Sequence, residues 1–114
     1  MREVNELLKI MEMLRDPEVG CPWDKEQTIE SLLPFTLEET YELFDAVERN
    51  DMQGLCSELG DLLFHIVYYA QLANEAGHFN FQDISEKINA KLRRRHPHVF
   101  GDAQINLSEE QSIA

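Results

Sequence analysis

The chain has 114 residues and a formal net charge of −12, because 22 acidic residues outnumber 10 lysines and arginines. A field of this sign opposes binding to nucleic-acid backbones and anionic membranes, so we expect neither as a partner. Its 43% hydrophobic and 28% charged residues are ordinary for one globular domain. Cys21 and Cys56 lack the spacing of a metal site or a disulfide framework, and neither a signal segment nor a membrane-length apolar run is evident. These features predict a soluble, cytoplasmic protein with reduced thiols.

In chain order, apolar residues recur at helical spacing in four long segments, and no segment has the alternating period of a strand. Asp16-Pro17 ends the first helix, and a short helical turn precedes the second, which begins at Pro34. Asn50-Asp51 breaks the second helix and caps the third. The sequence therefore predicts an all-α, four-helix bundle-like domain. Its helices should cover about residues 2–15, 34–49, 52–76 and 81–95.

Two segments lie outside these helices. Residues 16–27 hold two prolines and a glycine and are expected to form an ordered loop around Trp23. Large aromatic side chains in loops usually pack as plugs, and stacking of Trp23 on a base is the alternative. The last dozen residues are polar. We therefore expect a folded domain over residues 1–102 and a polar tail over 103–114.

The second and third predicted helices both carry acids three residues apart, Glu39-x-x-Glu42 and Glu58-x-x-Asp61. Residues at this spacing share one face of a helix, and no lysine or arginine lies three or four positions away from any of them. Antiparallel packing of the two helices would gather these carboxylates, which is costly unless a cation sits among them. All-oxygen ligands suit Mg²⁺ or Mn²⁺. The spacing thus predicts a site for a hard divalent metal.

Local explanations compete with this site. Thr36-x-x-Glu39 matches a capping box, and Glu38 and Glu42 could be solvated surface charges. A di-iron bundle also uses carboxylates on paired helices, but it requires Glu-x-x-His spacing. His65 does not lie three residues after any of the acids, which makes it a packing or hydrogen-bonding residue in this interpretation.

Four blocks in a fixed order carry a family resemblance: CPWDKEQT at 21–28, LEETYE at 37–42, ELGD at 58–61 and RRHPHVF at 94–100. Together they resemble the MazG family of nucleoside triphosphate pyrophosphohydrolases, within the all-α NTP pyrophosphatase group. The likeness covers about residues 4–102. Related dUTPases and dCTPases share the acidic pattern, whereas the tryptophan loop and the RRHPHVF block are more specific to this family.

The resemblance implies a dimerising helical bundle that hydrolyses NTP to NMP and pyrophosphate with Mg²⁺, or with Mn²⁺ in its place, in nucleotide-pool housekeeping. Glu38 would be the catalytic residue that orients the attacking water, or a ligand of a second metal ion. The presence of Lys91, Arg94 and Arg95 has an equally good local explanation, because positive charges are favourable at the C-terminus of a helix. By matched position the remaining roles are metal binding by Glu39, Glu42, Glu58 and Asp61, phosphate binding by Lys91, Arg94 and Arg95, and base binding by Trp23, Asp24 and Gln27.

The extent of the chain leaves a second hypothesis open. Many proteins of the family carry two such domains in tandem, and the RRHPHVF ending is typical of the first copy, which in some of them contributes little catalysis. The chain would then be either a natural single-domain member or a fragment. As an alternative to the enzyme, we consider a non-catalytic dimerisation or nucleotide-sensing domain.

Overall fold

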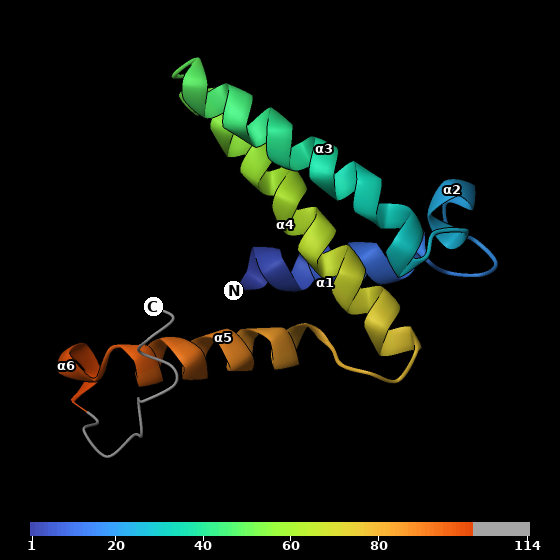
Figure 1. Ribbon diagram of the computed structural model, residues 1–114. Coiled ribbons are helices and arrows are strands. Elements are labelled where there is room, and N and C mark those ends of the chain that lie inside the picture. Colours follow the sequence, from blue (N-terminus) through green and yellow to red (C-terminus); the bar gives the residue numbers. More distant parts are fainter. Residues whose placement is uncertain (102–114) are drawn as a thin grey trace. The chain divides into compact units, whose positions relative to one another are not determined.

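Residues 1–101 are described by a computed structural model in which their regular structure is entirely helical (Figure 1). The predicted all-α class is confirmed, whereas the predicted tail over 103–114 lies outside the described residues. Two compact units are described separately, Met1–His78 and a second that begins at Phe79. The helices are α1 (Arg2–Leu14), α2 (Pro22–Lys25), α3 (Ile29–Glu48), α4 (Met52–Glu75), α5 (Phe81–Arg95) and α6 (Pro97–Phe100).

Three of the four long helices, α1, α4 and α5, have bounds within a residue or so of those predicted. Their ends carry the signals that the sequence shows. Asp51 caps the start of α4, and Gly77 follows its end with a positive φ of 80°. None of the helices within residues 1–101 has the length and apolar character needed to cross a membrane.

Helix α3 begins earlier than predicted and contains Pro34 in its interior. Thr28 is its N-cap: the Thr28 hydroxyl accepts from the Ser31 backbone N–H at 3.0 Å, and the Ser31 hydroxyl accepts from the Thr28 N–H at 2.8 Å. Such a reciprocal cap stabilises a helix start by about 1 kcal/mol. The predicted start at Pro34 is wrong, because this cap and the burial of Leu32 outweigh the one backbone donor that proline lacks.

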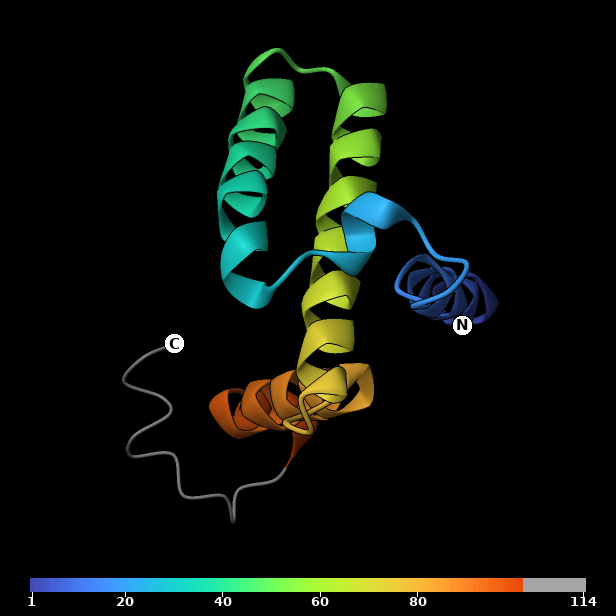
Figure 2. The ribbon, with the colours of Figure 1, turned by 90° about the vertical axis from the view of Figure 1, so that its right-hand side faces the viewer.

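Helices α3 and α4 lie side by side as an antiparallel hairpin (Figure 2). Asn50 in the connection has a φ of 55°, in the left-handed region that Asn tolerates better than most residues. The Asp51 carboxylate then accepts from the Gly54 N–H at 2.9 Å. A Cβ on Gly54 would lie 2.3 Å from a carboxylate oxygen of Asp51, so a larger residue at this position would require the Asp51 side chain to shift. The hairpin sets the acidic segment of α3 opposite that of α4.

Helix α1 crosses α4, so α4 packs against both α1 and α3 (Figure 2). Met11 of α1 and Val67, Tyr68 and Ala73 of α4 are almost fully shielded from solvent. Burial of a large apolar side chain is worth about 1.5–3 kcal/mol, so this crossing anchors the first unit. The core consists of Met11, Leu32, Ala46, Val67, Tyr68, Ala70, Leu72 and Ala73.

The predicted loop between the first two long helices contains the short helix α2. Before α2 the chain turns tightly: the Gly20 N–H donates to the Asp16 carbonyl at 3.0 Å, and the Cys21 N–H donates to the Leu14 carbonyl at 3.0 Å. A Cβ on Gly20 would lie 2.4 Å from the Leu14 carbonyl oxygen. Glycine is therefore required where α2 returns to the end of α1, which places Trp23 beside the rest of the unit.

The second unit is formed by α5 and the short helix α6. Asn80 caps α5 in a reciprocal pair with Asp83. At the other end of α5 the Arg93 guanidinium lies over the Phe100 ring, 5.7 Å from its centroid. Pro97 both ends α5 and begins α6, because its fixed φ suits the first position of a helix.

Candidate metal centre

Three acids from the two arms of the hairpin meet at one point. Glu39 projects from α3, and Glu58 and Asp61 project from adjacent turns of α4. One carboxylate oxygen from each lies within 4.8 Å of the other two. The i, i+3 spacing on α4 explains why Glu58 and Asp61 share a face, and the antiparallel packing brings Glu39 to it.

Glu39 is the most unusual of the three. Its side chain is only 7% exposed, and its Oε2 atom is buried with no hydrogen-bond partner among the described residues. Burial raises the pKa of Glu39 to about 8, and a hydrogen bond with Glu58 and the nearby charges of Asp61 and Glu42 act in the same direction. A buried carboxylate oxygen without a partner is costly. The free protein therefore holds an acid that a cation would satisfy.

The donor set fits a hard divalent cation. Only carboxylate oxygens converge in this group, with no sulfur or imidazole nitrogen, and this chemistry suits Mg²⁺ or Mn²⁺ more than zinc or copper. Mg²⁺ also keeps several waters and shares the oxygens of phosphates, so three protein ligands with an exposed margin are appropriate. The orphan oxygen of Glu39 and this ligand chemistry are consistent with a metal site.

The other two predicted acids of α3 lie at the margin. Glu42 and Glu38 are both exposed, and neither belongs to the three-residue group. Glu42 is near enough for its charge to raise the pKa of Glu39. Glu38 and Glu42 are therefore solvated surface charges in this structure. Both nevertheless lie close to the three-residue group, because they are one residue before and three residues after Glu39 on α3.

The capping-box alternative for Thr36 and Glu39 is wrong, because Thr36 lies inside α3 rather than at its start. The Thr36 hydroxyl lies 2.7 Å from His65 Nδ1 and 2.6 Å from the Tyr69 hydroxyl, both on α4. Burial lowers the pKa of His65, against the opposing effect of Asp61. As predicted, His65 is a hydrogen-bonding residue; it ties α3 to α4 one turn beyond Asp61.

The three predicted base-binding residues lie in and after α2, in different environments. Trp23 is 47% exposed and packs edge-to-face on Phe35, with ring centroids 5.4 Å apart. The Gln27 side chain donates to the Trp23 carbonyl at 3.0 Å and accepts from the Ser31 hydroxyl. Asp24 is buried, and its carboxylate accepts from the Tyr68 hydroxyl at 2.8 Å. Trp23 is therefore half exposed to solvent, whereas Asp24 fastens α2 to α4.

We expect Tyr68→Phe to lower the stability by about 1–3 kcal/mol, because it leaves the buried Asp24 carboxylate without its donor. Burial, reinforced by Asp24, also raises the pKa of Tyr68, so the hydroxyl keeps its proton throughout the ordinary pH range. Thermal unfolding measures the effect, and Tyr41→Phe, at an exposed tyrosine on α3, is the matched control. Equal melting temperatures for the two variants would contradict this role.

The predicted phosphate-binding residues belong to the second unit. Lys91, Arg94 and Arg95 lie in the last turns of α5 at i, i+3 and i, i+4 spacing, and all three are partly exposed. They share one face of the helix, and their position also suits the negative end of its dipole. The geometry of α5 is compatible with both interpretations made from the sequence.

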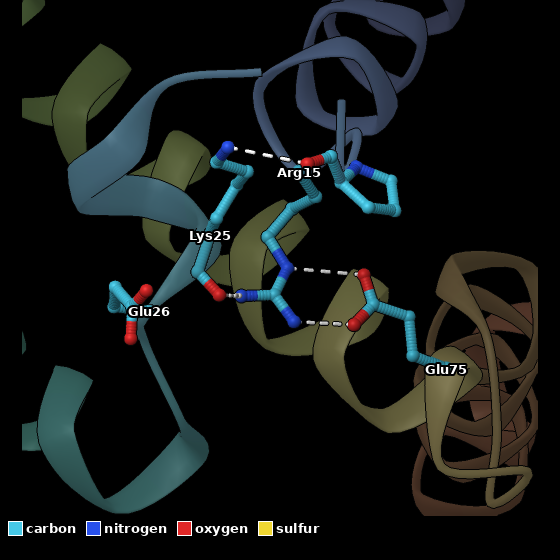
Figure 3. Close-up of a pocket in the computed structure, with 5 residues that line it drawn as sticks. Arg15, Lys25, Glu26 and Glu75 are labelled. Carbon is cyan, nitrogen blue, oxygen red and sulfur yellow. Dashed lines mark hydrogen bonds and ion pairs between the residues drawn. The ribbon is translucent and has the colours of Figure 1, made fainter. Parts of the chain in front are cut away.

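Arg15 and Glu75 are the most connected pair that the sequence did not single out. Arg15 follows α1 and Glu75 ends α4, yet their side chains form an ion pair with two contacts (Figure 3). Arg15 also donates to three backbone carbonyls of the α2 segment. The only feature of the sequence near this pair is that Arg15 precedes Asp16-Pro17, and this does not indicate that α2 and the end of α4 lie beside Arg15.

Comparisons with known proteins agree with these features. The family model described as the MazG nucleotide pyrophosphohydrolase domain matches residues 27–100. A nucleoside triphosphate pyrophosphohydrolase of Escherichia coli strain K12 is 57% identical over 110 residues, which is 96% of this chain. A protein of Thermotoga maritima named nucleoside triphosphate pyrophosphohydrolase/pyrophosphatase MazG is 51% identical over 98 residues, or 86% of the chain. The two matches cover 42% and 38% of those longer proteins.

The fold has a counterpart among solved structures. A crystal structure of a mazG-related protein from Thermotoga maritima superposes with a TM-score of 0.72 at 32% sequence identity, and the match covers 96% of this chain and 93% of that one. The family model, the relatives and this crystal structure all agree with the family that the four sequence blocks indicate. The chain belongs to the MazG nucleotide pyrophosphohydrolase domain family.

Proposed function

We propose that this chain is a nucleoside triphosphate pyrophosphohydrolase that uses Mg²⁺, or Mn²⁺ in its place, to convert NTP and water into NMP and pyrophosphate. The observation that carries the proposal is the buried, unpartnered oxygen of Glu39 beside Glu58 and Asp61. The names of the relatives from Escherichia coli and Thermotoga maritima support the same activity. We further propose a cytoplasmic role in nucleotide-pool housekeeping.

The metal-binding oxygens would come from Glu39, Glu58 and Asp61, with Glu42 as a fourth ligand reached from the exposed margin. A bound Mg²⁺ supplies positive charge that neutralises the phosphates and stabilises the departing pyrophosphate. Glu38 would orient the water for attack on the α-phosphorus, since it lies on the same stretch of α3 and is exposed. A carboxylate is suited to that task because it accepts a hydrogen bond from water.

Other residues would hold the two ends of the nucleotide. Lys91, Arg94 and Arg95 would contact the distal phosphates, with the arginines giving bidentate contacts. Trp23 would stack on the base and Gln27 would offer an amide to its edge. Asp24 would hold α2 in place rather than contact the base, because its carboxylate already accepts a hydrogen bond from the Tyr68 hydroxyl.

We also propose that the chain forms a homodimer or a higher homo-oligomer through the α3–α4 hairpin. Large apolar side chains at helical spacing are exposed along both arms, and a second copy of the same surface would remove them from water. Sedimentation at micromolar concentration tests this, and a monomer would contradict it. The exposed residues are Leu33, Leu37, Tyr41 and Phe44 on α3, and Met52, Leu59, Leu63 and Ile66 on α4.

The test of the activity is pyrophosphate release from a panel of common and modified NTPs, with and without Mg²⁺ or Mn²⁺. We expect metal-dependent release that falls on the order of 10²-fold or more in Glu58→Gln and Asp61→Asn, because each removes a charged metal ligand. Glu48→Gln, at an exposed acid near the end of α3, is the control and should retain activity.

Two outcomes would overturn the enzymatic proposal. The first is no pyrophosphate from any NTP with either metal. The second is equal activity in Asp61→Asn and the control. Metal-dependent nucleotide binding without turnover would instead support the nucleotide-sensing alternative, and iron in the purified protein would support the di-iron bundle.

A further inference from the structure

Arg15 joins the end of α1 to the nearby α2 segment and to the end of α4, which lies 60 residues further along the chain. Its Nη1 atom donates to the carbonyls of Asp24, Lys25 and Gln27 at 2.7, 3.2 and 3.0 Å. Its Nε atom donates to Glu75 at 3.0 Å, and Nη2 contacts the other Glu75 oxygen (Figure 3). One guanidinium therefore connects the end of α1, the end of α2 and the end of α4.

These contacts need the shape of arginine. The carbonyls at the end of a helix have no partner within it, and the short helix α2 presents several of them together. A planar guanidinium carries five N–H donors and can serve these carbonyls on one side and a carboxylate on the other. The Lys25 side chain adds a separate contact, donating to the Pro17 carbonyl at 3.2 Å.

Glu75 holds the guanidinium in this orientation. The hydrogen bond from Arg15 lowers the pKa of Glu75, and the same bond raises the pKa of Arg15, so both groups are charged at neutral pH. The Gln71 amide donates to Glu75 at 2.9 Å and fixes the carboxylate from the other side. The Arg15 side chain is largely buried, which makes the pair stronger than an exposed surface ion pair.

The segment fixed by Arg15 is the one that carries Trp23 and Gln27. The three carbonyls that Arg15 contacts belong to residues 24, 25 and 27, which follow Trp23 directly. The Gln27 side-chain amide in turn donates to the Trp23 carbonyl. A cavity of about 520 Å³ adjoins the clamp and is lined by Arg15, Glu75 and Glu26, among others. The cavity gives the α2 segment room to shift if the clamp is removed.

We propose that Arg15, oriented by Glu75, is a positioning residue that sets the place of Trp23 and Gln27 for the base of the nucleotide. This inference rests on the proposed function, in which those two residues meet the base. The clamp does not touch the carboxylates of the metal site. Its loss should therefore weaken substrate binding while the chemical step is largely kept.

Trp23 is the only tryptophan of the chain, so its fluorescence reports the position of α2 directly, without any substrate. The variants are Arg15→Gln, Arg15→Lys and Glu75→Gln. Arg49→Gln is the matched control, because Arg49 also forms an ion pair but at the exposed end of α3. Helix content from circular dichroism establishes that each variant is folded.

We expect acrylamide to quench Trp23 more efficiently in Arg15→Gln than in the wild type, with an intermediate value in Arg15→Lys and no change in Arg49→Gln. In pyrophosphate release, KM should rise roughly ten-fold or more in Arg15→Gln, while kcat stays within about three-fold. Glu75→Gln should shift both measurements in the same directions. It keeps the test decisive if the Arg15 variants do not fold.

Unchanged quenching in Arg15→Gln and Glu75→Gln would overturn the positioning role, as would a fall in kcat with KM unaltered. A wild type that releases no pyrophosphate would instead be a failure of the proposed function. In that case the quenching series still decides whether Arg15 fixes Trp23, and titration of Trp23 fluorescence with NTP and Mg²⁺ replaces KM.

Discussion

Replacing Glu39 by Gln should stabilise the metal-free protein at pH 8 and abolish its stabilisation by Mg²⁺. The wild-type carboxylate is buried with one unpartnered oxygen beside Glu58 and Asp61, so its ionisation is unfavourable. Gln keeps the size of the side chain and removes the charge. The measurement is Tm with a chelator and again with millimolar Mg²⁺.

The pH dependence gives this prediction its sign. Because the pKa of Glu39 is raised to about 8, the folded protein keeps this proton between about pH 4.5 and 8, where the unfolded chain has lost it. The stability that the proton confers is complete below the unfolded pKa and is lost as pH rises through the folded pKa. The slope is at most about 1.4 kcal/mol per pH unit. In Glu39→Gln this part of the slope should disappear.

With Mg²⁺ the difference in stability between the two proteins should narrow. A ligand at 100 times its Kd stabilises the folded state by about 2.7 kcal/mol, which the wild type gains and Glu39→Gln does not. Glu48→Gln, at an exposed position of the same helix, should follow the wild type in both conditions. If Glu39→Gln gained as much from Mg²⁺ as the wild type, Glu39 would not be a metal ligand.

Met11→Ala should destabilise the protein by about 2–5 kcal/mol, because Met11 is fully buried where α1 crosses α4. The truncation leaves a cavity against α4 that the helices can fill only in part. Tm should fall by at least about 10 °C in a domain of this size. Thermal or urea unfolding measures the loss.

Met13 supplies the matched control, since it is two residues away on α1 and 68% exposed. Met13→Ala should change stability by less than about 0.5 kcal/mol. Similar losses in the two variants would mean that the crossing of α1 and α4 does not form the core.

Much of the fold follows from patterns that act over a few residues. Apolar periodicity and caps such as Asp51 located the ends of α1, α4 and α5 nearly correctly. The start of α3 was mispredicted because Pro34 is a strong local signal, whereas the Thr28–Ser31 cap gains its effect only with a buried Leu32 behind it. Local rules conflict at such a point, and packing decides between them.

The site was less predictable for a different reason. Sequence spacing places Glu58 and Asp61 on one face of α4, but on α3 it does not distinguish Glu39 from Glu42 as the residue that meets them. Which of those two is buried depends on the rotation of α3 against α4, and that is set by packing along the whole hairpin. The contacts of Arg15 with the carbonyls of residues 24, 25 and 27 depend on the path of the backbone, which no side-chain pattern records.

The three-residue connection Arg49-Asn50-Asp51 has a consequence for how chains of this design can vary in length. An inserted or deleted residue would have to be absorbed at Asn50 or in the Asp51–Gly54 cap, both of which have fixed geometry. If it were passed into α4 instead, every side chain of α4 would rotate by about 100° about the helix axis. Glu58 and Asp61 would then face away from Glu39. Insertions should therefore be excluded from the tip of the hairpin.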